Sequence, residues 1–527
     1  MQSQRCNAPW YELNISCPDE RVSCCCYYNG PIDPYKIDEK NVDAYWNSHN
    51  MQRVRELNSS VDSDEKNGCS NCFYFNNFNN ADYFSGLNPD SPPRNMSDLQ
   101  RKNWELSVSE YAAGRTSVES RPMLYYFNFG FACNLSCIQC IQVPYRTTNK
   151  KQLKAETLFS WKDAFRSALE VRVIGGEVFV LPEAIKFIRW FIDQDDLEDV
   201  TLGIITNGSL LHKHLNTLKR KRKLVLSFSL DSVGESYEEI RTGGVWKQVA
   251  ENIAEFLSVA QEEGREWSGA IGSGLMRTGL RHLPDLAAWA MDNRMGISFF
   301  EVGMVRGNEA VIEHESYLWN PLVLDHVPNW SEKFDQAIDI FRTHGHPHTA
   351  DTLGIFQKTL HSKIERARRE ASDFDRWEAE RETVPLFDLQ PTQDSIHNLM
   401  PVVIGDALEK VLVPGPAGLC FRPTKLYDHL ATEFVEIERN GDRQPLLRLT
   451  VEWPADVKPA DQCWIMVQDQ NFNYTNGVHQ ETHVGETVRL EKRIRLKDHV
   501  RRVRLILYGN EQEAKRLPLS VKVMLSP

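Results

Sequence analysis

The sequence predicts an α/β protein: a partial (β/α)6 barrel, with a cysteine-rich segment before the barrel and a β-sandwich after it. Three observations predict this organisation. Between residues 122 and about 310, short apolar runs alternate with amphipathic helical stretches, as in parallel βα units. Most of the twelve cysteines lie in the first 75 residues. From about residue 424 the hydrophobic period changes to two, which is typical of half-buried strands.

A chain of 527 residues has room for several domains. We expect five consecutive parts. They are an auxiliary-cluster segment (1–78), a linker (79–120), the barrel (121–312), a helical and Pro-rich connector (313–423) and the sandwich (424–527).

The composition is that of an ordinary soluble protein, with 41% hydrophobic and 25% charged residues. A net charge of −12 argues against a nucleic-acid partner, and we interpret the basic run Lys219–Lys223 as a solvated helix end. No apolar run is long enough to span a membrane, and no signal peptide opens the chain. Twelve cysteines without an export signal indicate a reducing compartment, the cytoplasm, and metal binding rather than disulfides.

Six strands with intervening helices form the predicted barrel. The clearest helix runs from Trp246 to Glu263, with its apolar residues on one face. In such folds the chemistry lies at the carboxyl ends of the strands. The predicted strands are 122–130, 170–175, 200–206, 224–230, 268–276 and 297–304.

Three cysteines follow the first barrel strand in the run Phe131-Ala-Cys133-Asn-Leu-Ser-Cys137-Ile-Gln-Cys140. Three thiolates on one short loop suit an iron–sulfur cluster, which normally takes four ligands, so one iron would stay open. Structural zinc is the alternative, but it closes its coordination with a fourth Cys or His. No such residue lies close downstream.

The next predicted strands each end in a short polar or glycine-containing motif. The second ends in Gly175-Gly176-Glu177, the third in Thr206-Asn207-Gly208 and the fourth in Ser229-Leu-Asp231, which Tyr237–Arg241 follows. Glycines there let a ligand approach the backbone, and an arginine fork suits a carboxylate. Each motif alone is weak, because glycine pairs usually form plain turns and arginines usually form surface ion pairs.

Together with the CxxxCxxC spacing, these motifs resemble the radical S-adenosylmethionine (radical SAM) superfamily. The resemblance implies a [4Fe–4S] cluster on Cys133, Cys137 and Cys140, whose open iron binds SAM. It implies that Gly175, Gly176 and Glu177 bind the SAM amino group. It also implies that Ser229 reaches the SAM ribose or carboxylate and that Arg241 pairs with the carboxylate, with Asn207 and Asp231 in the same site. One residue departs from the family pattern: Gln139 stands where an aromatic residue usually precedes the third cysteine.

A second group of cysteines lies at the N-terminus, and four of its thiolates are enough to close a second cluster. On a strand, Cys25 would point opposite to Cys24 and Cys26. A zinc knuckle on the same residues is the alternative. The predicted second ligand set is Cys6, Cys25, Cys69 and Cys72.

The residues around these cysteines resemble the SPASM or twitch segment of radical SAM enzymes, which favours Cys25 as the ligand of the triplet. Most relatives carry the segment after the barrel, whereas here it precedes it. The resemblance implies a second, auxiliary [4Fe–4S] cluster. The matching residues are Cys6, Pro9, Trp10, Val22, Cys25, Cys26, Trp46-Asn-Ser48, Val54-Arg55, Cys69 and Cys72.

The resemblance implies that a 5′-deoxyadenosyl radical takes hydrogen from a substrate C–H bond, with electrons from a flavodoxin- or ferredoxin-type reductant. We predict epimerisation of a sugar centre in a saccharide or glycosylated natural product, with Cys26 or Cys24 returning a hydrogen atom. Glu301, at the end of the sixth strand, would face substrate, or form a salt-bridged rim. One alternative is oxidation, by dehydrogenation or peptide cross-linking, with the auxiliary cluster accepting the electron. Another is a non-catalytic, zinc-binding scaffold.

The C-terminal region supplies the prediction of a saccharide substrate. Its short strands (446–453, 463–467, 487–490 and 503–508) predict a sandwich that broadly resembles carbohydrate-binding domains. Trp453, Trp464, Phe472 and Tyr474 are candidates for stacking on sugar rings, although a core position is favoured for Trp464.

Overall fold

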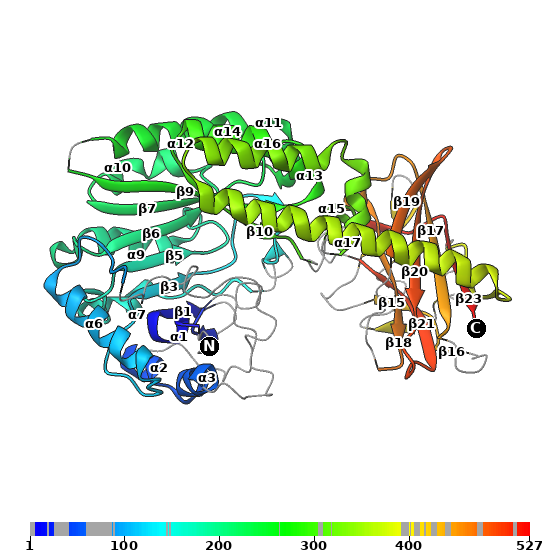
Figure 1. Cartoon of the computed structure of the whole chain (residues 1–527), viewed down its shortest axis with the longest axis horizontal. Coiled ribbons are helices and arrows are strands. Elements are labelled where there is room, and N and C mark those ends of the chain that lie inside the picture. The colour runs from blue at the N-terminus through cyan, green and yellow to red at the C-terminus, as the bar shows by residue number, and fades with distance from the viewer. Residues whose placement is uncertain are drawn as a thin grey trace.

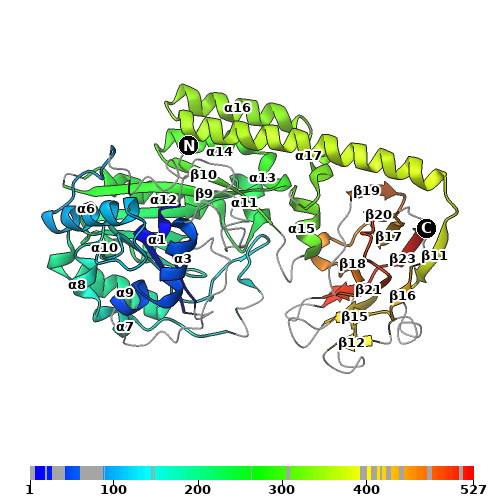
Figure 2. The ribbon, with the colours of Figure 1, turned by 60° about the horizontal axis from the view of Figure 1, so that its bottom comes forward.

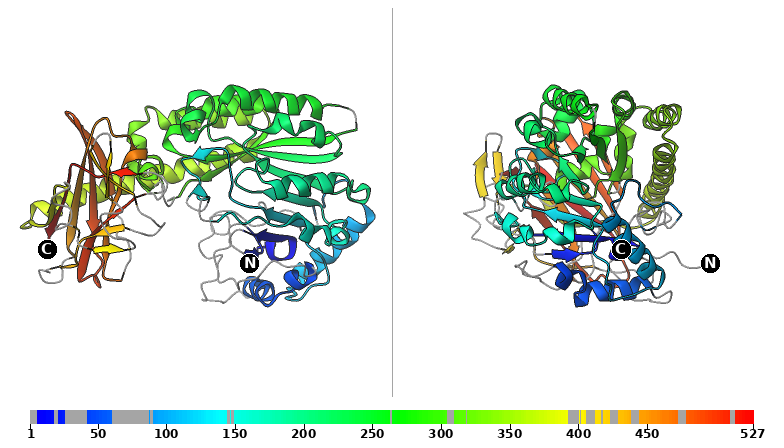
Figure 3. Two further views of the ribbon diagram at one scale, coloured as in Figure 1. Left: turned by 180° about the vertical axis from the view of Figure 1, so that it is seen from behind. Right: turned by 90° about the vertical axis from the view of Figure 1, so that its left-hand side faces the viewer.

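The structure is a computed structural model, and its elements are labelled in Figure 1. A barrel-like sheet with its helices lies at one end and an antiparallel sandwich at the other, seen from behind in Figure 3. The residues it describes are 6–17, 21–25, 42–59, 87, 90–143, 146, 149–262, 264–303, 309–317, 319–391, 400, 402–404, 412–415, 418–422, 429–437, 444–471, 478–509 and 514–527.

All six predicted barrel strands are present, and each pairs in parallel with its neighbours in the order β10-β9-β7-β6-β5-β3. Along β5, and along β7 after its first residue, buried and half-buried residues alternate, because helices cover one face of the sheet. The α/β fold class is confirmed. The strands are β3 (Leu124–Asn128), β5 (Glu170–Ile174), β6 (Thr201–Thr206), β7 (Lys223–Ser229), β9 (Glu266–Leu275) and β10 (Gly296–Glu301).

Two N-terminal strands extend this sheet beyond β3. Strand β1 (Glu12–Ser16) runs parallel to β3, and β2 (Arg21–Ser23) pairs antiparallel to β1 at the edge. The side chains of Trp10 and Trp46 are fully buried in the same hydrophobic core as the barrel strands. The described residues of the cysteine-rich segment therefore pack against the barrel and extend its sheet.

Helices cover the barrel sheet as the sequence patterns predict. The helix expected at 246–263 is α12 (Trp246–Ala260), and part of the expected linker is a helix, α6 (Asp98–Ala112). A capping box between Ser97 and Gln100 begins α6. The other helices before β10 are α1 (Ala8–Tyr11), α2 (Val42–Trp46), α3 (His49–Ser59), α7 (Ala155–Phe159), α8 (Lys162–Phe165), α9 (Pro182–Ile192), α10 (Leu215–Leu218), α11 (Gly234–Ile240), α13 (Arg277–Leu280) and α14 (Leu283–Asp292), with short 3-10 turns η3 (Asp195–Leu197) and η4 (Leu211–Lys213).

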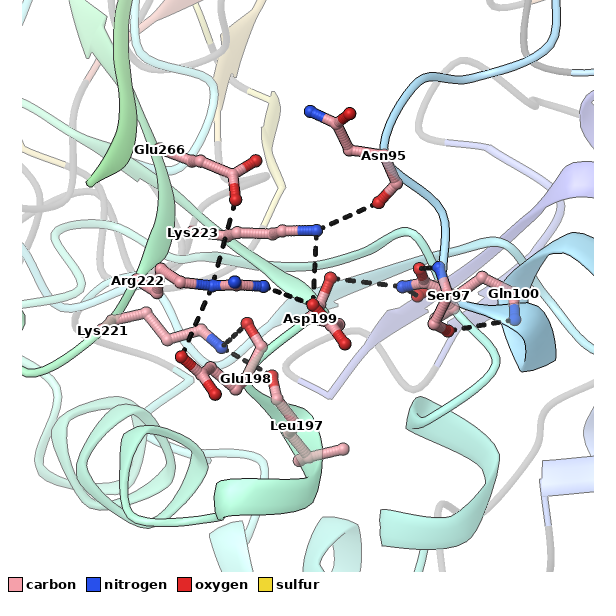
Figure 4. A network of polar contacts seen from close by, with 11 residues as sticks. Asn95, Ser97, Gln100, Leu197, Glu198, Asp199, Lys221, Arg222, Lys223 and Glu266 are labelled. Atoms are coloured by element: carbon pink, nitrogen blue, oxygen red, sulfur yellow. Dashed lines mark hydrogen bonds and ion pairs between the residues drawn. The ribbon is translucent and has the colours of Figure 1, made fainter. Parts of the chain in front are cut away.

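The basic run before β7 is part of a polar network at the amino end of the sheet (Figure 4). Lys221 is buried and donates to the carbonyl oxygens of Leu197 (2.6 Å) and Glu198 (3.1 Å). Burial lowers the pKa of Lys221 to about 8. Arg222 and Lys223 form ion pairs with Asp199. The prediction of a solvated helix end was wrong for these three residues, because their charged groups bind residues 197–199 of the preceding loop.

The connector is helical as predicted and contains the helices α16 (Trp330–Thr343) and α17 (Pro347–Ala379). The 33-residue α17 runs from the barrel to the sandwich, as Figure 2 shows. Before them lie α15 (Glu309–Glu315) and η5 (Pro321–His326). In the described part of the chain, no helix is both long and apolar enough to cross a membrane.

The C-terminal region is a set of antiparallel sheets, as predicted. One sheet has the order β11-β23-β17-β20-β19, and a second is built around β21, which pairs with β15, β16 and β18. Trp453 lies in the sandwich core. The strands are β11 (Val384–Leu389), β12 (Val402–Ile404), β13 (Leu412–Gly415), β14 (Gly418–Phe421), β15 (His429–Ala431), β16 (Val435–Glu436), β17 (Leu446–Pro454), β18 (Trp464–Asp469), β19 (Val478–Val484), β20 (Thr487–Arg495), β21 (Arg502–Tyr508), β22 (Lys515–Arg516) and β23 (Ser520–Ser526), and η6 (Pro459–Asp461) precedes β18.

Helix α15 joins the sandwich to the carboxyl end of the barrel. Ile312 packs in a small cluster with Val302, which follows β10, and with Ile138, between the second and third barrel cysteines. The neighbouring Glu313 forms a buried ion pair with Lys492 of β20. One helix therefore contacts both the cysteine loop and the sandwich.

Candidate functional site

The three barrel cysteines lie on the loop that leaves the carboxyl end of β3. Cys137 belongs to a two-residue strand, β4 (Ser136–Cys137), which pairs antiparallel with β8 (Arg241–Thr242). In this pairing Cys137 lies opposite Arg241, although the two are far apart in the sequence. A turn follows, in which the Cys140 amide donates to the Cys137 carbonyl (3.2 Å). The loop therefore carries all three cysteines to the end of the sheet where the motifs were predicted to meet.

Gly176 is the point at which the cysteine loop crosses the end of β5. A Cβ atom at Gly176 would lie 2.3 Å from the carbonyl oxygens of Phe131 and Ala132. The Gly176 amide donates to Gly130 (2.8 Å), and the Glu177 amide donates to Ala132 (2.9 Å). Glycine is required here by close backbone approach. The partner that approaches is the cysteine loop itself, which the sequence motif could not show.

Nitrogen donors surround the three sulfur atoms. The Leu135 amide donates to Cys133 Sγ (3.4 Å), Arg241 Nη1 to Cys137 Sγ (3.7 Å) and Arg146 Nη2 to Cys140 Sγ (3.4 Å). Burial raises the pKa of the Cys137 thiol to about 11, and the nearby Arg241 guanidinium opposes this rise. Donors and cations of this kind favour thiolates, the form that binds metal.

The Glu177 carboxylate is fully buried and connects two strand ends. It accepts hydrogen bonds from the Thr206 hydroxyl (2.8 Å), the Asn207 amide (2.8 Å) and the Phe179 amide (3.2 Å). Burial raises the pKa of Glu177, and these hydrogen bonds oppose the rise. The side chain of Asn207 reaches Cys133 Sγ (3.9 Å), so two predicted site residues do meet at the cysteine loop.

Asp231 and Arg241 form a buried ion pair beside Cys137. Their side chains are 0% and 8% exposed, and Arg241 Nη2 lies 2.7 Å from Asp231 Oδ2. Asp231 also accepts hydrogen bonds from the Gly274 amide (2.7 Å) and from the Gln139 side chain. Ser229, half-buried, ends β7 just before this pair. Gln139, the departure from the family pattern, is thus part of the Asp231 network.

Several buried polar atoms around this ion pair have no hydrogen-bond partner among the described residues. They include Gln139 Oε1, Arg241 Nε, Tyr237 OH, Ser232 Oγ and Ser273 Oγ. Buried polar groups are normally satisfied, so a cluster of unsatisfied ones indicates a place for ligand or water. Three thiols, two nearby arginines and these free donors and acceptors fit a [4Fe–4S] cluster with a polar, carboxylate-bearing ligand such as SAM.

Glu301 ends β10 and is paired with Lys363 of α17 (3.4 Å). Its side chain is 12% exposed, and burial raises its pKa while Lys363 opposes the rise. This is the salt-bridged position that the sequence left open as an alternative to a substrate contact.

The N-terminal motif residues converge, although they are widely separated in the sequence. The Arg55 side chain is fully buried, stacks 4.4 Å from the Trp46 ring centroid and donates to the carbonyl oxygens of Pro9 and Trp46 (2.8 Å each). Burial lowers the pKa of Arg55 to about 10, and Cys24 opposes this. Arg55 therefore holds the Pro-Trp and Trp-Asn-Ser motifs together next to the cysteines.

Cys6, Cys24 and Cys25 are all buried beside this motif. The other three cysteines predicted for this region, Cys26, Cys69 and Cys72, lie outside the described residues. Among those that the structure describes, no three His, Cys, Asp or Glu side chains are grouped to hold a single metal ion.

The strand directions place Cys24 and Cys25 at the other end of the sheet from the cysteine loop. Strand β2 runs antiparallel to β1, so these residues follow it toward Glu12, which pairs with the first residue of β3. Burial raises the pKa of Glu12 to about 8, and the adjacent Cys25 adds to the rise. The loop of Cys133 instead leaves the last residue of β3, about 13 Å along the strand. Cys24 and Cys25 therefore lie away from the cysteine loop.

Comparison with known proteins supports part of these expectations. Residues 127–264 match the family model of the radical SAM superfamily. The GTP 3′,8-cyclase of Limosilactobacillus fermentum is 32% identical over 127 residues, or 23% of this chain and 38% of that protein. The GTP 3′,8-cyclase of Campylobacter lari is 26% identical over 132 residues, or 24% and 40%. The chain thus spans less than half the length of these curated relatives.

Two solved structures are also similar. Streptococcus suis SuiB bound to S-adenosylmethionine has 16% identity and a TM-score of 0.31, covering 40% of this chain and 48% of that one. A radical SAM methyltransferase from Sphaerobacter thermophilus has 15% identity and a TM-score of 0.30, covering 42% and 64%. The family match spans the cysteine loop and the strand-end motifs through Arg241. Residues 127–264 are therefore similar to the radical SAM superfamily.

Proposed function

We propose that this protein is a radical SAM enzyme that removes a hydrogen atom from a substrate C–H bond. The observation that carries the proposal is the loop of Cys133, Cys137 and Cys140. It offers three thiols, at the carboxyl end of a parallel sheet, beside buried and unsatisfied polar atoms. Three thiolates hold a [4Fe–4S] cluster and leave one iron open for SAM.

Cys133, Cys137 and Cys140 would hold the cluster, which would supply, when reduced, the electron for cleavage of SAM into methionine and a 5′-deoxyadenosyl radical. The chain's own residues hold and orient these groups. Gly176 lets the cysteine loop cross β5, and Glu177 ties the ends of β5 and β6 together. Arg241 Nε and Gln139 Oε1 would supply one free donor and one free acceptor to SAM. The binding of the SAM amino group by the Gly175–Glu177 segment and of its ribose or carboxylate by Ser229 belongs to the same proposal.

We also propose a second [4Fe–4S] cluster on Cys6, Cys25, Cys69 and Cys72. The position of Arg55 supports this proposal. Arg55 hydrogen-bonds to the carbonyl oxygens of Pro9 and Trp46, and so joins two parts of the motif beside the buried Cys6 and Cys25. Placed at the other end of the sheet from the first cluster, such a cluster would exchange electrons over a distance and would not contact SAM.

The triple variant Cys133→Ala/Cys137→Ala/Cys140→Ala tests the function and the second cluster together. After anaerobic reconstitution, the wild type is expected to bind about eight irons and the variant about four. With dithionite as reductant, the wild type should form 5′-deoxyadenosine from SAM and the variant none. A wild type that binds iron at the loop but forms no 5′-deoxyadenosine would contradict the proposed function. An iron content of about four that falls to none would contradict the second cluster only.

The finer proposal is epimerisation of a sugar centre in a saccharide or glycosylated natural product. Its candidate hydrogen donors are Cys26, which lies outside the described residues, and Cys24, which lies with Cys25 at the other end of the sheet from the cysteine loop. The support for a saccharide substrate comes from the sandwich architecture and not from these two tryptophans. Trp453 lies in the sandwich core, and Trp464 packs against Trp319 of the connector. A flavodoxin- or ferredoxin-type reductant and a cytoplasmic setting complete the proposal.

Reaction in D2O separates epimerisation from oxidation. An epimerase takes one hydrogen from carbon and returns one from a solvent-exchangeable thiol, so its product should carry one deuterium. A dehydrogenase or peptide cross-linking enzyme returns none, and an unlabelled, oxidised product would contradict the epimerase proposal. Mass spectrometry of the product measures this, with the same reaction in H2O as the control.

A further inference from the structure

In the described part of the chain, two arginines contact the sulfur atoms of the cysteine loop, and they differ in electrostatic surroundings. Arg241 contacts Cys137 and is paired at 2.7 Å with the buried Asp231, so its charge is largely offset. Arg146 contacts Cys140 and also donates to the Leu135 carbonyl oxygen, which carries no net charge. Arg146 forms no ion pair with any residue in the described part of the chain.

The side chain of Arg146 is held in place over the loop. Its Nη1 donates to the carbonyl oxygen of Leu135, and its Nη2 lies 3.4 Å from Cys140 Sγ. One guanidinium therefore contacts the loop on both sides of Cys137. Its Nε is buried. Its positive charge also favours the Cys133 thiolate. Arg146 therefore brings an uncompensated positive charge within hydrogen-bonding distance of one ligand and close to another.

We infer that Arg146 sets the reduction potential of the cluster held by this loop, an inference that rests on the proposed function. Reduction adds one electron, delivered by the external reductant, and makes the cluster one unit more negative. A fixed cation next to the sulfurs stabilises this reduced form more than the oxidised form, which raises the potential. The pair of Arg241 and Asp231 is close to neutral, so it contributes a hydrogen bond to sulfur but little net charge.

Arg146→Gln and Arg146→Lys test this inference. Gln removes the charge but keeps a donor, whereas Lys keeps the charge. The midpoint potential of each reconstituted protein is measured without SAM, by anaerobic titration followed by electron paramagnetic resonance. At the wild-type midpoint, Arg146→Gln is expected to lower the ratio of reduced to oxidised cluster about tenfold, a shift of about 59 mV for one electron. Arg146→Lys should stay within a factor of about two of the wild type.

An unchanged midpoint in Arg146→Gln, or a shift in Arg146→Lys as large as that in Arg146→Gln, would overturn the inference. The titration follows the signal lost in the triple cysteine variant, so an N-terminal cluster is not mistaken for this one. Absence of that signal from the wild type would instead contradict the proposed function.

If Arg146→Gln fails to retain the cluster, Arg146→His replaces it in the test. A change of pH then removes the positive charge at position 146 within a single variant. Imidazole loses its charge near pH 6.5. The midpoint of Arg146→His should therefore fall between pH 5.5 and 7.5 by more than that of the wild type. Identical pH dependence in the two proteins would overturn the inference.

Discussion

Replacing Gly176 by alanine is expected to remove the cluster from the cysteine loop and to destabilise the barrel. The new Cβ would lie 2.3 Å from two backbone oxygens, those of Phe131 and Ala132, and backbone atoms cannot move aside as a flexible side chain can. Relief of the clash breaks the hydrogen bonds that join Gly176 to Gly130 and Glu177 to Ala132. We expect a loss of about 3 kcal/mol, the upper end of the usual cost of overpacking.

Gly296→Ala is the matched control. Gly296 begins β10 in the same sheet, and a Cβ atom there meets no atom within 4 Å. Iron content after reconstitution and the thermal unfolding midpoint measure both effects. We expect Gly176→Ala to lose about four irons and Gly296→Ala to keep them. A Gly176→Ala protein with wild-type iron content and midpoint would show that the loop does not cross β5 as described.

Asp231→Ala is expected to destabilise the protein by about 3–5 kcal/mol, the usual cost of leaving one member of a buried ion pair without its partner. The variant removes the carboxylate that Arg241, Gln139 and the Gly274 amide all share. Arg241 would stay buried, with Cys137 Sγ as its remaining acceptor among the described residues. Urea and thermal unfolding of the metal-free protein measure the loss without a contribution from the cluster.

Asp193→Ala is the control for this prediction. Asp193 pairs with Arg220 at 2.6 Å, but both side chains are more than half exposed, so the expected loss is below about 1 kcal/mol. The double variant Asp231→Ala/Arg241→Met should lose less than the sum of the two single variants, because no unpaired charge then remains buried. Equal losses in Asp231→Ala and Asp193→Ala would contradict the description of a buried pair.

The barrel strands could be predicted from the sequence because each shows its pattern locally. Apolar runs recur six times with amphipathic stretches between them, three of the runs end in a glycine or polar motif, and the structure confirms all six strands. Their parallel pairing then brings the motifs to one edge of the sheet, which explains why Cys133 and Asn207 do meet.

The position of the N-terminal segment could not be predicted in this way. Strand β1 pairs with β3, more than 100 residues later, and local periodicity contains no information on so distant a partner. This pairing decides the placement of Cys24 and Cys25, at the other end of the sheet from the cysteine loop.

The packing partners of individual residues could not be predicted from the sequence either. Glycine before Glu177 indicated a close approach, but the approaching group is the cysteine loop rather than a ligand. Trp464 is buried as favoured, yet it packs on the connector side, where its ring centroid lies 6.3 Å from that of Trp319, and not in the sandwich interior. In each case the sequence shows the residue type, while its partner depends on the assembled fold.

The most direct test of the account is whether SAM binds the iron that the three cysteines leave open. The electron paramagnetic resonance spectrum of the reduced, reconstituted protein would be recorded with and without SAM. We expect SAM to change the signal of the cluster on Cys133, Cys137 and Cys140 and to leave that of the N-terminal cluster unchanged. A reduced cluster on the cysteine loop whose spectrum does not respond to saturating SAM would contradict the account.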